Sequence, residues 1–330
     1  MGIPVVTITM GDPAGVGPEV VLKALAHPRI RRVCHPIVLG DLGILQRTQR
    51  QRRGYPFKLT LWEKGQPLPK DENTVPVYSV TSLSPRQSRP GHLSRACGEA
   101  AYRYISAAVD LIRSGTANAM ATAPINKRAL QLAGYRYPGH TEMLAEMTKT
   151  KECRMMLLGK RLKVVLVTVH VPLAQVSREL SRKRVRITLE LTHQALLQDF
   201  RIPRPRLAVA GLNPHAGEGG LFGLEEKRII LPAVRDARGK GIRAYGPFPA
   251  DSLFHQVVRG EYDVVISMYH DQGLGPLKLL HFSDGVNLTL GLPIVRTSVD
   301  HGTAYEIAGK NKADSSSMKE AIFLASTLAR

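Results

Sequence analysis

The stretch Lys-Val-Val-Leu-Val-Thr-Val, residues 163–169, carries no charge after its first residue and is rich in β-branched side chains. Such a run is typical of a strand that is buried on both faces, as in a parallel sheet covered by helices. Comparable short apolar runs lie on both sides of it along the chain. We predict strands at Pro4–Thr9, Pro36–Leu39, Ala117–Thr122, Lys163–Val169, Arg206–Gly211 and Tyr262–Met268.

Longer stretches with helical periodicity lie between these runs. Ser94 is expected to cap a helix that reaches about Ser114, with Gly115 as its stop, and Ser181 to cap one that reaches about Phe200. Further helices are predicted at Glu225–Gly239 and Ser315–Ala329. The alternation of strands and helices predicts an α/β protein with a largely parallel, helix-covered sheet.

The composition narrows the class of protein. The 330 residues are 43% hydrophobic, which is ordinary for a globular chain and excludes a disordered or collagen-like one. No apolar run approaches the roughly 18 residues that a membrane span needs, and no signal-peptide pattern is present. Cys34, Cys97 and Cys153 are odd in number and lack metal-type spacing. We therefore expect reduced thiols and a cytoplasmic protein.

The formal net charge of +19 suggests a nucleic-acid partner. Most of the excess comes from Arg29–Lys58 and Arg178–Arg206, where Tyr55, Phe57 and Phe200 are the aromatic residues. Three rings offer little stacking surface for bases. A solvated basic face that also attracts anionic substrates is therefore favoured over nucleic-acid binding.

Three histidines share one context, because each follows a predicted strand. They are His170, His215 and His270. The carboxyl ends of parallel strands face one crevice, where three neutral imidazoles would suit Zn²⁺ or a similar divalent ion. The alternative is that each histidine is only a polar residue that ends a strand. The separations of 45 and 55 residues match no local metal motif.

A second set of residues suits an anion. His140 and Thr141 stand at a predicted loop-to-helix junction, and free N–H groups at a helix start attract phosphate or carboxylate. Lys278, Asn287 and Arg296 add cationic and amide donors downstream. Taken singly, each of these residues also fits a surface or capping role.

Two glycine-rich segments, residues 11–18 and 217–223, do not have the GxGxxG spacing of a dinucleotide-binding loop, and no Walker A sequence occurs. Each segment fits either a tight turn or a backbone that a ligand approaches closely.

A set of longer sequence motifs covers the chain from near its N-terminus to near its C-terminus. They are ThrMetGlyAspProAlaGlyValGlyProGlu (9–19), ThrAlaProIleAsnLys (122–127), GlyHisThrGlu (139–142), GlyLeuAsnProHisAlaGlyGluGlyGly (211–220), GlyProPheProAlaAsp (246–251), MetTyrHisAspGlnGly (268–273), LeuGlyLeuProIleValArgThrSerValAspHisGlyThr (290–303) and AspHisGlyThrAlaTyrGluIleAlaGly (300–309). Together they resemble the 4-hydroxythreonine-4-phosphate dehydrogenase family of pyridoxal phosphate biosynthesis.

The resemblance implies an α/β/α fold related to isocitrate and isopropylmalate dehydrogenases, which bind NAD without a GxGxxG loop. It implies two interleaved domains with the active site in the cleft between them. Residues 1–135 plus 285–330 would form the cofactor-side domain, and residues 136–284 the metal, substrate and dimerisation domain. It also implies a homodimer whose active sites lie at the subunit interface.

The family's functional residues carry over onto matching positions. His170, His215 and His270 match its metal ligands, contributed by both subunits to one Zn, Mg or Co ion per site. Substrate contacts match His140, Thr141, Lys278, Asn287 and Arg296. The segment His301, Gly302 and Thr303 resembles the part that holds the adenosine of NAD or NADP. Asp251 and Asp271 are candidate bases. One departure is Gly275, where the family usually has a bulky apolar residue before the lysine.

The implied reaction is the NAD(P)-dependent oxidation of 4-phosphohydroxy-L-threonine at C3, followed by decarboxylation. A paralogue that oxidises 4-phospho-threonate or 4-phospho-erythronate is the nearest alternative. A metal-dependent hydrolase of phosphate esters and a basic nucleic-acid-binding protein are alternatives from other classes, and neither accounts for the long strings.

Overall fold

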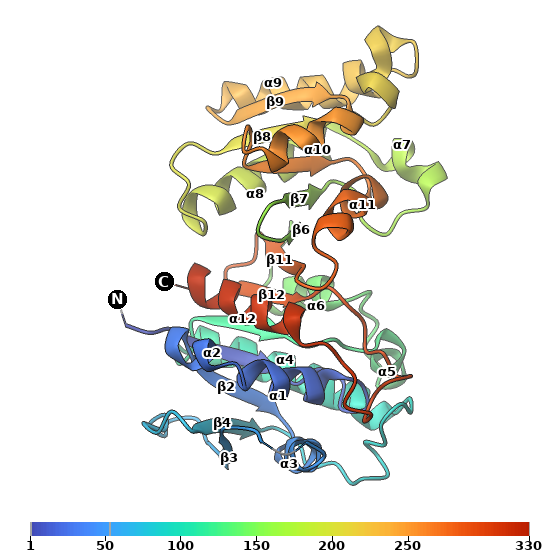
Figure 1. Ribbon diagram of the computed structural model, residues 1–330. Helices are drawn as coiled ribbons and strands as arrows, with labels where there is room; N and C mark the ends of the chain where they lie inside the picture. The colour runs from blue at the N-terminus through green and yellow to red at the C-terminus, as the bar shows by residue number, and fades with distance from the viewer. Residues whose placement is uncertain (1, 53, 330) are drawn as a thin grey trace. The chain divides into compact units, whose positions relative to one another are not determined.

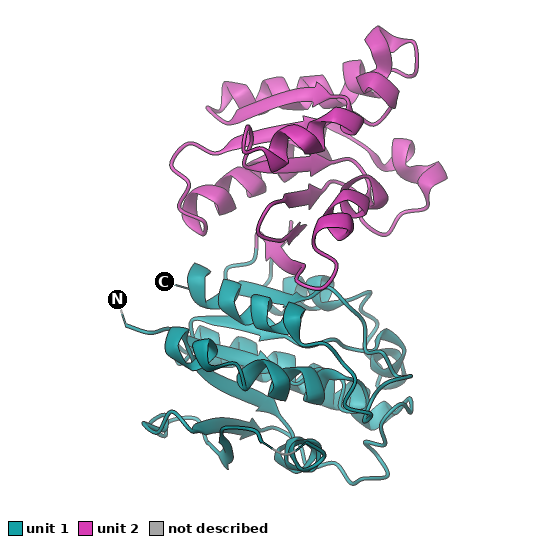
Figure 2. Cartoon of the chain, viewed as in Figure 1, with its two compact units in different colours: residues 1–150, 292–330 teal, residues 151–291 magenta. Residues whose placement is uncertain are grey.

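The computed structural model describes residues 2–52 and 54–329, which form two compact units (Figure 2). Unit 1 holds the described residues up to Thr150 and from Leu292 onward, and unit 2 holds Lys151–Gly291. Residues 136–150 therefore lie in unit 1 and residues 285–291 in unit 2. Within the described ranges, no helix is both long and apolar enough to cross a membrane.

Unit 1 contains a parallel sheet with the strand order β3-β4-β2-β1-β5-β12. Helices α1, α2 and α12 lie on one face and α4 on the other (Figure 1). The elements are β1 (Val5–Thr9), α1 (Gly17–Leu25), α2 (Pro28–Val33), β2 (His35–Gly40), α3 (Leu42–Arg50), β3 (Lys58–Leu61), β4 (Thr74–Ser79), α4 (Arg95–Arg113), β5 (Ala119–Thr122), α5 (Lys127–Leu132), α6 (His140–Met147), β12 (Val295–Val299) and α12 (Ser316–Leu328).

Unit 2 contains strands in the order β11-β6-β7-β10-β8-β9. Strands β7, β10, β8 and β9 are parallel, and β6 is antiparallel to both of its neighbours. The elements are β6 (Arg154–Leu158), β7 (Lys163–Leu166), η1 (Leu173–Gln175), α7 (Val176–Glu179), α8 (Arg182–Gln198), β8 (Arg206–Ala210), η2 (Pro214–Gly220), η3 (Glu226–Ile230), α9 (Leu231–Gly239), β9 (Arg243–Phe248), α10 (Ala250–Val258), β10 (Val264–Ser267), α11 (His270–Leu280) and β11 (Val286–Leu290).

The apolar run at residues 163–169 forms β7 over its first four positions only. Val164, Val165 and Leu166 are fully buried, as expected for a strand covered on both faces. Beyond the strand, the backbone N–H groups of Val167 and Thr168 still donate to the carbonyls of Ser267 and Met268. The run therefore stays tied to β10 past its formal end.

The predicted helices are present. Ser181 caps α8 by accepting a hydrogen bond from the Arg184 N–H at 3.2 Å. Ser94 occupies the N-cap position of α4, but its side chain makes no capping hydrogen bond. The helix predicted at Glu225–Gly239 is divided, with the π-helical η3 leading into α9.

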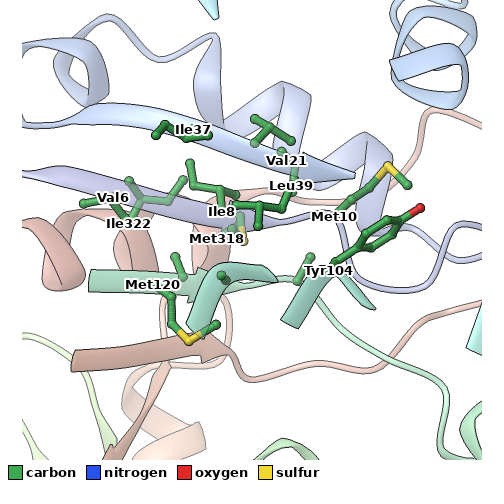
Figure 3. Packing of buried hydrophobic residues seen from close by; sticks show 14 of the residues in the cluster. Val6, Ile8, Met10, Val21, Ile37, Leu39, Tyr104, Met120, Met318 and Ile322 are labelled. Carbon is green, nitrogen blue, oxygen red and sulfur yellow. The ribbon is translucent and has the colours of Figure 1, made fainter. Parts of the chain in front are cut away.

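Each unit has its own core. In unit 1, Val6, Ile8 and Met10 of β1 and its extension pack against residues of β2, α1 and α12 (Figure 3). In unit 2, Val164 and Leu166 of β7 join Ala208, Val265 and residues of α10 and α11. Burial of these apolar surfaces fixes which strand ends lie side by side, and the strand ends carry the polar residues described next.

Candidate active site

Arg296 is the centre of a charged cluster in unit 1. It is the second residue of β12, where it is paired in register with Met120 of β5, and only 2% of it is exposed. Its Nε and Nη2 donate to Thr122 Oγ1 at 3.2 and 2.8 Å. Burial lowers the pKa of the guanidinium, while the Glu142 charge opposes that shift. A buried guanidinium near one end of a strand is a group suited to binding a carboxylate or phosphate.

His140 is the first residue of α6, after Gly139 at the N-cap. Its Nε2 atom is buried and has no hydrogen-bond partner among the described residues. Burial, and secondarily the charge of Arg296, holds the pKa of this imidazole well below its usual range. His140 is therefore neutral at physiological pH, beside a buried guanidinium and at the start of a helix. Such a combination suits one anionic oxygen and one hydroxyl or further polar group.

The glycine-rich loop 11–18 packs against the segment that follows β12. A Cβ atom on Gly17 would lie 2.1 Å from the Met10 carbonyl oxygen, and one on Gly15 would lie 3.0 Å from Thr303. The Val16 N–H donates to the Thr303 carbonyl at 3.0 Å. At these positions glycine is required because other parts of the chain approach closely.

A buried carboxylate holds this loop in place. Asp12 Oδ1 accepts from the Ala14 N–H at 2.8 Å, and Oδ2 accepts from the Tyr305 hydroxyl at 2.6 Å. Burial raises the pKa of Asp12, and these hydrogen bonds oppose that shift. His301 and Gly302, two of the predicted cofactor contacts, are exposed just before this anchor, and Thr303 is half-buried.

In unit 2 the structure brings two of the three predicted metal ligands together. The rings of His170 and His270 have their centroids 5.9 Å apart. They follow β7 and β10, which are adjacent and parallel, as the sequence context predicts. His270 Nδ1 lies 2.7 Å from Asp271 Oδ1. A carboxylate at Nδ1 fixes the ring and leaves Nε2 available for a ligand.

His215 lies in an unusual turn after β8, the other neighbour of β10. His215, Ala216, Gly217, Glu218 and Gly219 all have positive φ, between 40° and 79°. A left-handed conformation costs a non-glycine residue about 1–2 kcal/mol, so this backbone is held by the surrounding structure. The turn leaves the His215 side chain 63% exposed.

His215 has a carboxylate and an aromatic ring as neighbours. Its Nδ1 lies 3.1 Å from Glu218 Oε2, and that hydrogen bond, ahead of the weaker charge of Asp251, raises the pKa of His215. The Phe222 ring lies edge-on with its centroid 6.1 Å away. Within residues 2–52 and 54–329, no group of three His, Cys, Asp or Glu side chains is close enough to hold a metal ion. A single chain therefore gathers the His170–His270 pair and leaves His215 outside it.

The remaining predicted site residues are placed as follows. Lys278 is on α11, with its Nζ 5.7 Å from the Phe282 ring centroid. The helix continues through Gly275 and Pro276, so the departure at Gly275 does not break the element that carries the lysine. Asn287 lies on β11, and its buried Oδ1 has no partner among the described residues.

The two candidate bases differ in their surroundings. Asp271 is 90% exposed and is engaged with His270. Asp251 is exposed in the first turn of α10, where its Oδ1 accepts a hydrogen bond from the Ser252 N–H at 2.9 Å.

Sequence reasoning did not single out the groups that hold these residues in position. Glu226 accepts hydrogen bonds from the turn before His215, and Gln272 links Met268 to Gly211. Gln272 lies inside the MetTyrHisAspGlnGly string, which was the available signal. Glu226 lies outside every string, and nothing in a single sequence distinguishes it from a surface glutamate.

A buried guanidinium beside an imidazole of lowered pKa in unit 1, and a histidine pair at strand ends in unit 2, are features typical of α/β enzymes. The model of the family "Pyridoxal phosphate biosynthetic protein PdxA" matches residues 32–325. The chain belongs to this family. It is thus an oxidoreductase of the dehydrogenase type, and such a family implies a nicotinamide cofactor.

Individual relatives agree over the full length. The 4-hydroxythreonine-4-phosphate dehydrogenase of Geobacter metallireducens is 51% identical, over 99% of this chain and 96% of that protein. The D-threonate 4-phosphate dehydrogenase of Cupriavidus necator is 47% identical, over 97% and 96%. A crystal structure of the 4-hydroxythreonine-4-phosphate dehydrogenase of Klebsiella pneumoniae superposes with a TM-score of 0.89 at 44% identity, covering 99% of this chain and 98% of that one.

Proposed function

We propose that this enzyme oxidises 4-phosphohydroxy-L-threonine at C3 with NAD⁺ or NADP⁺, in the biosynthesis of pyridoxal 5'-phosphate. The product, 2-amino-3-oxo-4-phosphohydroxybutanoate, then loses CO₂ to give 3-amino-2-oxopropyl phosphate. The observation that carries the proposal is buried Arg296 beside neutral His140, an anion site inside a chain that is 51% identical to an enzyme named for this substrate.

Residues of unit 1, and separately residues of unit 2, are assigned to the anionic ends of the substrate. Arg296 and the His140–Thr141 helix start supply a fixed cation, a neutral imidazole and free N–H groups. Lys278 supplies a second cation, and Asn287 an amide whose buried Oδ1 can accept from a substrate hydroxyl or amino group. The buried groups are already desolvated, so less reorganisation is needed when the substrate binds.

A divalent cation fits the histidines of unit 2. His170 and His270 offer two imidazoles from adjacent strand ends, and the Asp271 contact leaves Nε2 of His270 available. His215 is assigned as the third ligand, and Zn, Mg or Co as the metal. When bound, the cation supplies Lewis acidity that lowers the pKa of the substrate's C3 hydroxyl and favours the enolate left by decarboxylation.

A homodimer is proposed because His215 is outside the pair within one chain, and the ligands are expected from both subunits. Unit 2 also exposes large apolar side chains on four of its segments, and a second copy could cover some of them. They are Leu173, Leu197, Leu221, Phe222, Leu224, Leu279 and Phe282. Unit 2 is therefore assigned the metal and dimerisation roles.

Asp251 is the better candidate for the base that takes the C3 hydroxyl proton. Asp271 is already engaged with His270, whereas Asp251 acts on His215 only through its charge. A bound nicotinamide would accept the hydride from C3, and with it the two electrons of the C–H bond, as Asp251 takes the hydroxyl proton. His301, Gly302 and Thr303 are assigned to the adenosine part of NAD(P), which places the cofactor role in unit 1. Cysteine usage supports the cytoplasm as the location.

The test is direct. Purified protein, 4-phosphohydroxy-L-threonine, NAD⁺ or NADP⁺ and a divalent metal should give reduced nicotinamide, measured as a rise in its near-ultraviolet absorbance, together with CO₂. No absorbance rise with either cofactor across Zn²⁺, Mg²⁺ and Co²⁺ would sink the proposal.

A second candidate substrate is D-threonate 4-phosphate, with 4-phospho-erythronate as its close analogue. It is favoured by the Cupriavidus relative, which is nearly as similar to this chain as the Geobacter one. 4-Phosphohydroxy-L-threonine carries an amino group where the threonate carries a hydroxyl group. Side-by-side kcat/KM values decide between them, and a higher value for the threonate would replace the first proposal.

The basic surface does not favour a nucleic-acid function. The guanidinium carbons of Arg31 and Arg52 lie 5.7 and 5.5 Å from the ring centroids of Phe57 and Tyr55. These rings therefore stack with the protein's own cations rather than forming an open platform for bases.

A further inference from the structure

The turn that carries His215 is built around a buried carboxylate. Glu226, the first residue of η3, is only 4% exposed. Its Oε1 accepts from the backbone N–H groups of Leu212 and Asn213, both at 2.8 Å. Its Oε2 accepts from Asn213 Nδ2 at 3.0 Å. Three donors from two successive residues thus converge on one side chain, immediately before the left-handed turn begins.

The packing around this carboxylate is close. A Cβ atom on Gly217 would lie 2.6 Å from Glu226 Oε2, and one on Gly211 would lie 3.2 Å from Oε1. The chain therefore packs on the carboxylate both before the turn, at Gly211, and in the middle of it, at Gly217. Asn213 Nδ2 also donates to Glu225 Oε2 at 2.8 Å, so the amide is held from two sides.

The element that carries Glu226 is irregular in a way that fits this role. η3 is a π-helix, and the Leu231 N–H donates to the Glu226 carbonyl five residues before it. Such insertions shift the direction of side chains and are common at functional sites. Beyond η3 the chain continues as the regular α9 helix.

We propose that Glu226 is a positioning residue: by fixing Leu212 and Asn213 it presets the left-handed turn and so sets the direction in which His215 meets a divalent cation. The inference rests on the proposed metal-dependent function. Glu226 itself touches neither the cation nor the substrate. Its effect is on the backbone that carries a ligand whose side chain is 63% exposed and contacts Glu218.

The experiment measures Co²⁺ binding to the full-length protein after treatment with a chelator, using the visible absorption of the bound ion. The variants are Glu226→Gln, which keeps the shape of the side chain, and Glu226→Ala, which removes every acceptor. Glu190→Gln is the matched control, because Glu190 is on α8 of the same unit and pairs with Arg186 and Lys240 instead.

We expect Glu226→Ala to weaken Co²⁺ binding about 10- to 100-fold, the usual range for residues that orient a metal ligand, and to change the spectrum at saturation. Glu226→Gln should fall between it and the wild type. Glu190→Gln should bind as the wild type does. A purely structural role would lower the Tm but leave the saturated spectrum unchanged, so the spectrum separates the two roles.

The inference is overturned if both Glu226 variants titrate with the wild-type affinity and spectrum, whatever their Tm. If circular dichroism shows Glu226→Ala to be unfolded, Glu226→Gln alone decides. The His215→Ala variant distinguishes a failure of the proposed role of Glu226 from a failure of the proposed metal site. Loss of Co²⁺ binding in His215→Ala with normal Glu226 variants sinks this inference but not the metal site. Absence of Co²⁺ binding by the wild type sinks the proposed metal function itself, and this inference with it.

Discussion

The two units hold their candidate residues in opposite ways. In unit 1, Arg296 is 2% exposed and is fixed by the sheet in which it lies. In unit 2, the His215 side chain is 63% exposed and the His270 side chain 38% exposed, and contacts of their Nδ1 atoms with Glu218 and Asp271, rather than burial, hold the rings. Burial changes the pKa of the side chains in unit 1, whereas the exposed turn in unit 2 determines the direction in which the His215 side chain points.

This difference predicts that substitutions in the two units will affect stability and activity differently. A buried cation affects folding as well as binding, because its desolvation is already part of the free energy of the folded state. An exposed imidazole contributes little to folding, so its loss should register in activity alone. The following predictions, from the largest expected effect to the smallest, test this separation.

Replacing His270 with alanine should lower kcat/KM at least about 1000-fold, because Lewis acidity from a bound metal is worth several kcal/mol to the transition state. The Tm should stay near that of the wild type, since the side chain is partly exposed. His255→Ala on α10, also in unit 2 and exposed, is the control. Turnover close to that of the wild type in His270→Ala would remove the histidine pair from the site.

Replacing Arg296 with methionine should raise KM for the phosphorylated substrate about 10- to 100-fold, the value of one or two charge-assisted hydrogen bonds. Because the guanidinium is desolvated by the fold and methionine carries no charge, the Tm should be higher. Arg103→Met, an exposed arginine on α4, should change neither quantity. A large fall in Tm with unchanged KM would show that Arg296 is structural.

His140 should make the folded state sensitive to acid. The pKa of its imidazole is lowered on folding, so below about pH 6.5 the unfolded chain binds a proton that the folded chain does not. Stability contributed by the neutral ring is complete above that pH and is lost as the pH falls toward the folded pKa. His140→Asn should therefore lose stability less steeply, by up to about 1.4 kcal/mol per pH unit.

Urea unfolding between about pH 7 and pH 5 measures this slope. The exposed His35 supplies the control, and His35→Asn should follow the wild type. Parallel curves for His140→Asn and the wild type would show that His140 is solvated rather than buried beside Arg296.

Arg31 should show the smallest effect. Its Nη1 donates to the carbonyls of Pro56 and Glu72, and its guanidinium stacks on Phe57. Arg31→Met should cost about 1 kcal/mol of unfolding free energy and leave kcat/KM unchanged. Arg32→Met, an exposed neighbour, should cost close to nothing. A fall in kcat/KM with Arg31→Met would show that this arginine contributes to substrate binding or turnover.

Much of the fold was predictable because it depends on local pattern. The apolar runs identified β1, β2, β5, β7, β8 and β10, and their separation by helices indicated a largely parallel sheet. β6 was not identified, and neither was its antiparallel pairing with β7, because pairing direction depends on a long-range partner. β12 was not identified as a strand, since a buried arginine contradicts the apolar pattern.

The site was predictable only in part. Strand ends placed His170 and His270 together, because neighbouring parallel strands end at the same edge of a sheet. The left-handed turn that carries His215 could not be predicted, since residues other than glycine rarely have positive φ, and His215, Ala216 and Glu218 all do. Glu226 could not be predicted either, because its partners are defined by the folded turn.

By itself the sequence determined the kinds of chemistry available to this protein: imidazoles after strands, cations near a helix start, and an alternation that specifies an α/β fold. Tertiary structure alone decided the state of those groups. It buries Arg296 and lowers the pKa of His140, because desolvation depends on everything packed around a side chain. It also holds His215 in a conformation that local preferences oppose, in a turn whose preceding residues donate hydrogen bonds to a buried carboxylate from another element.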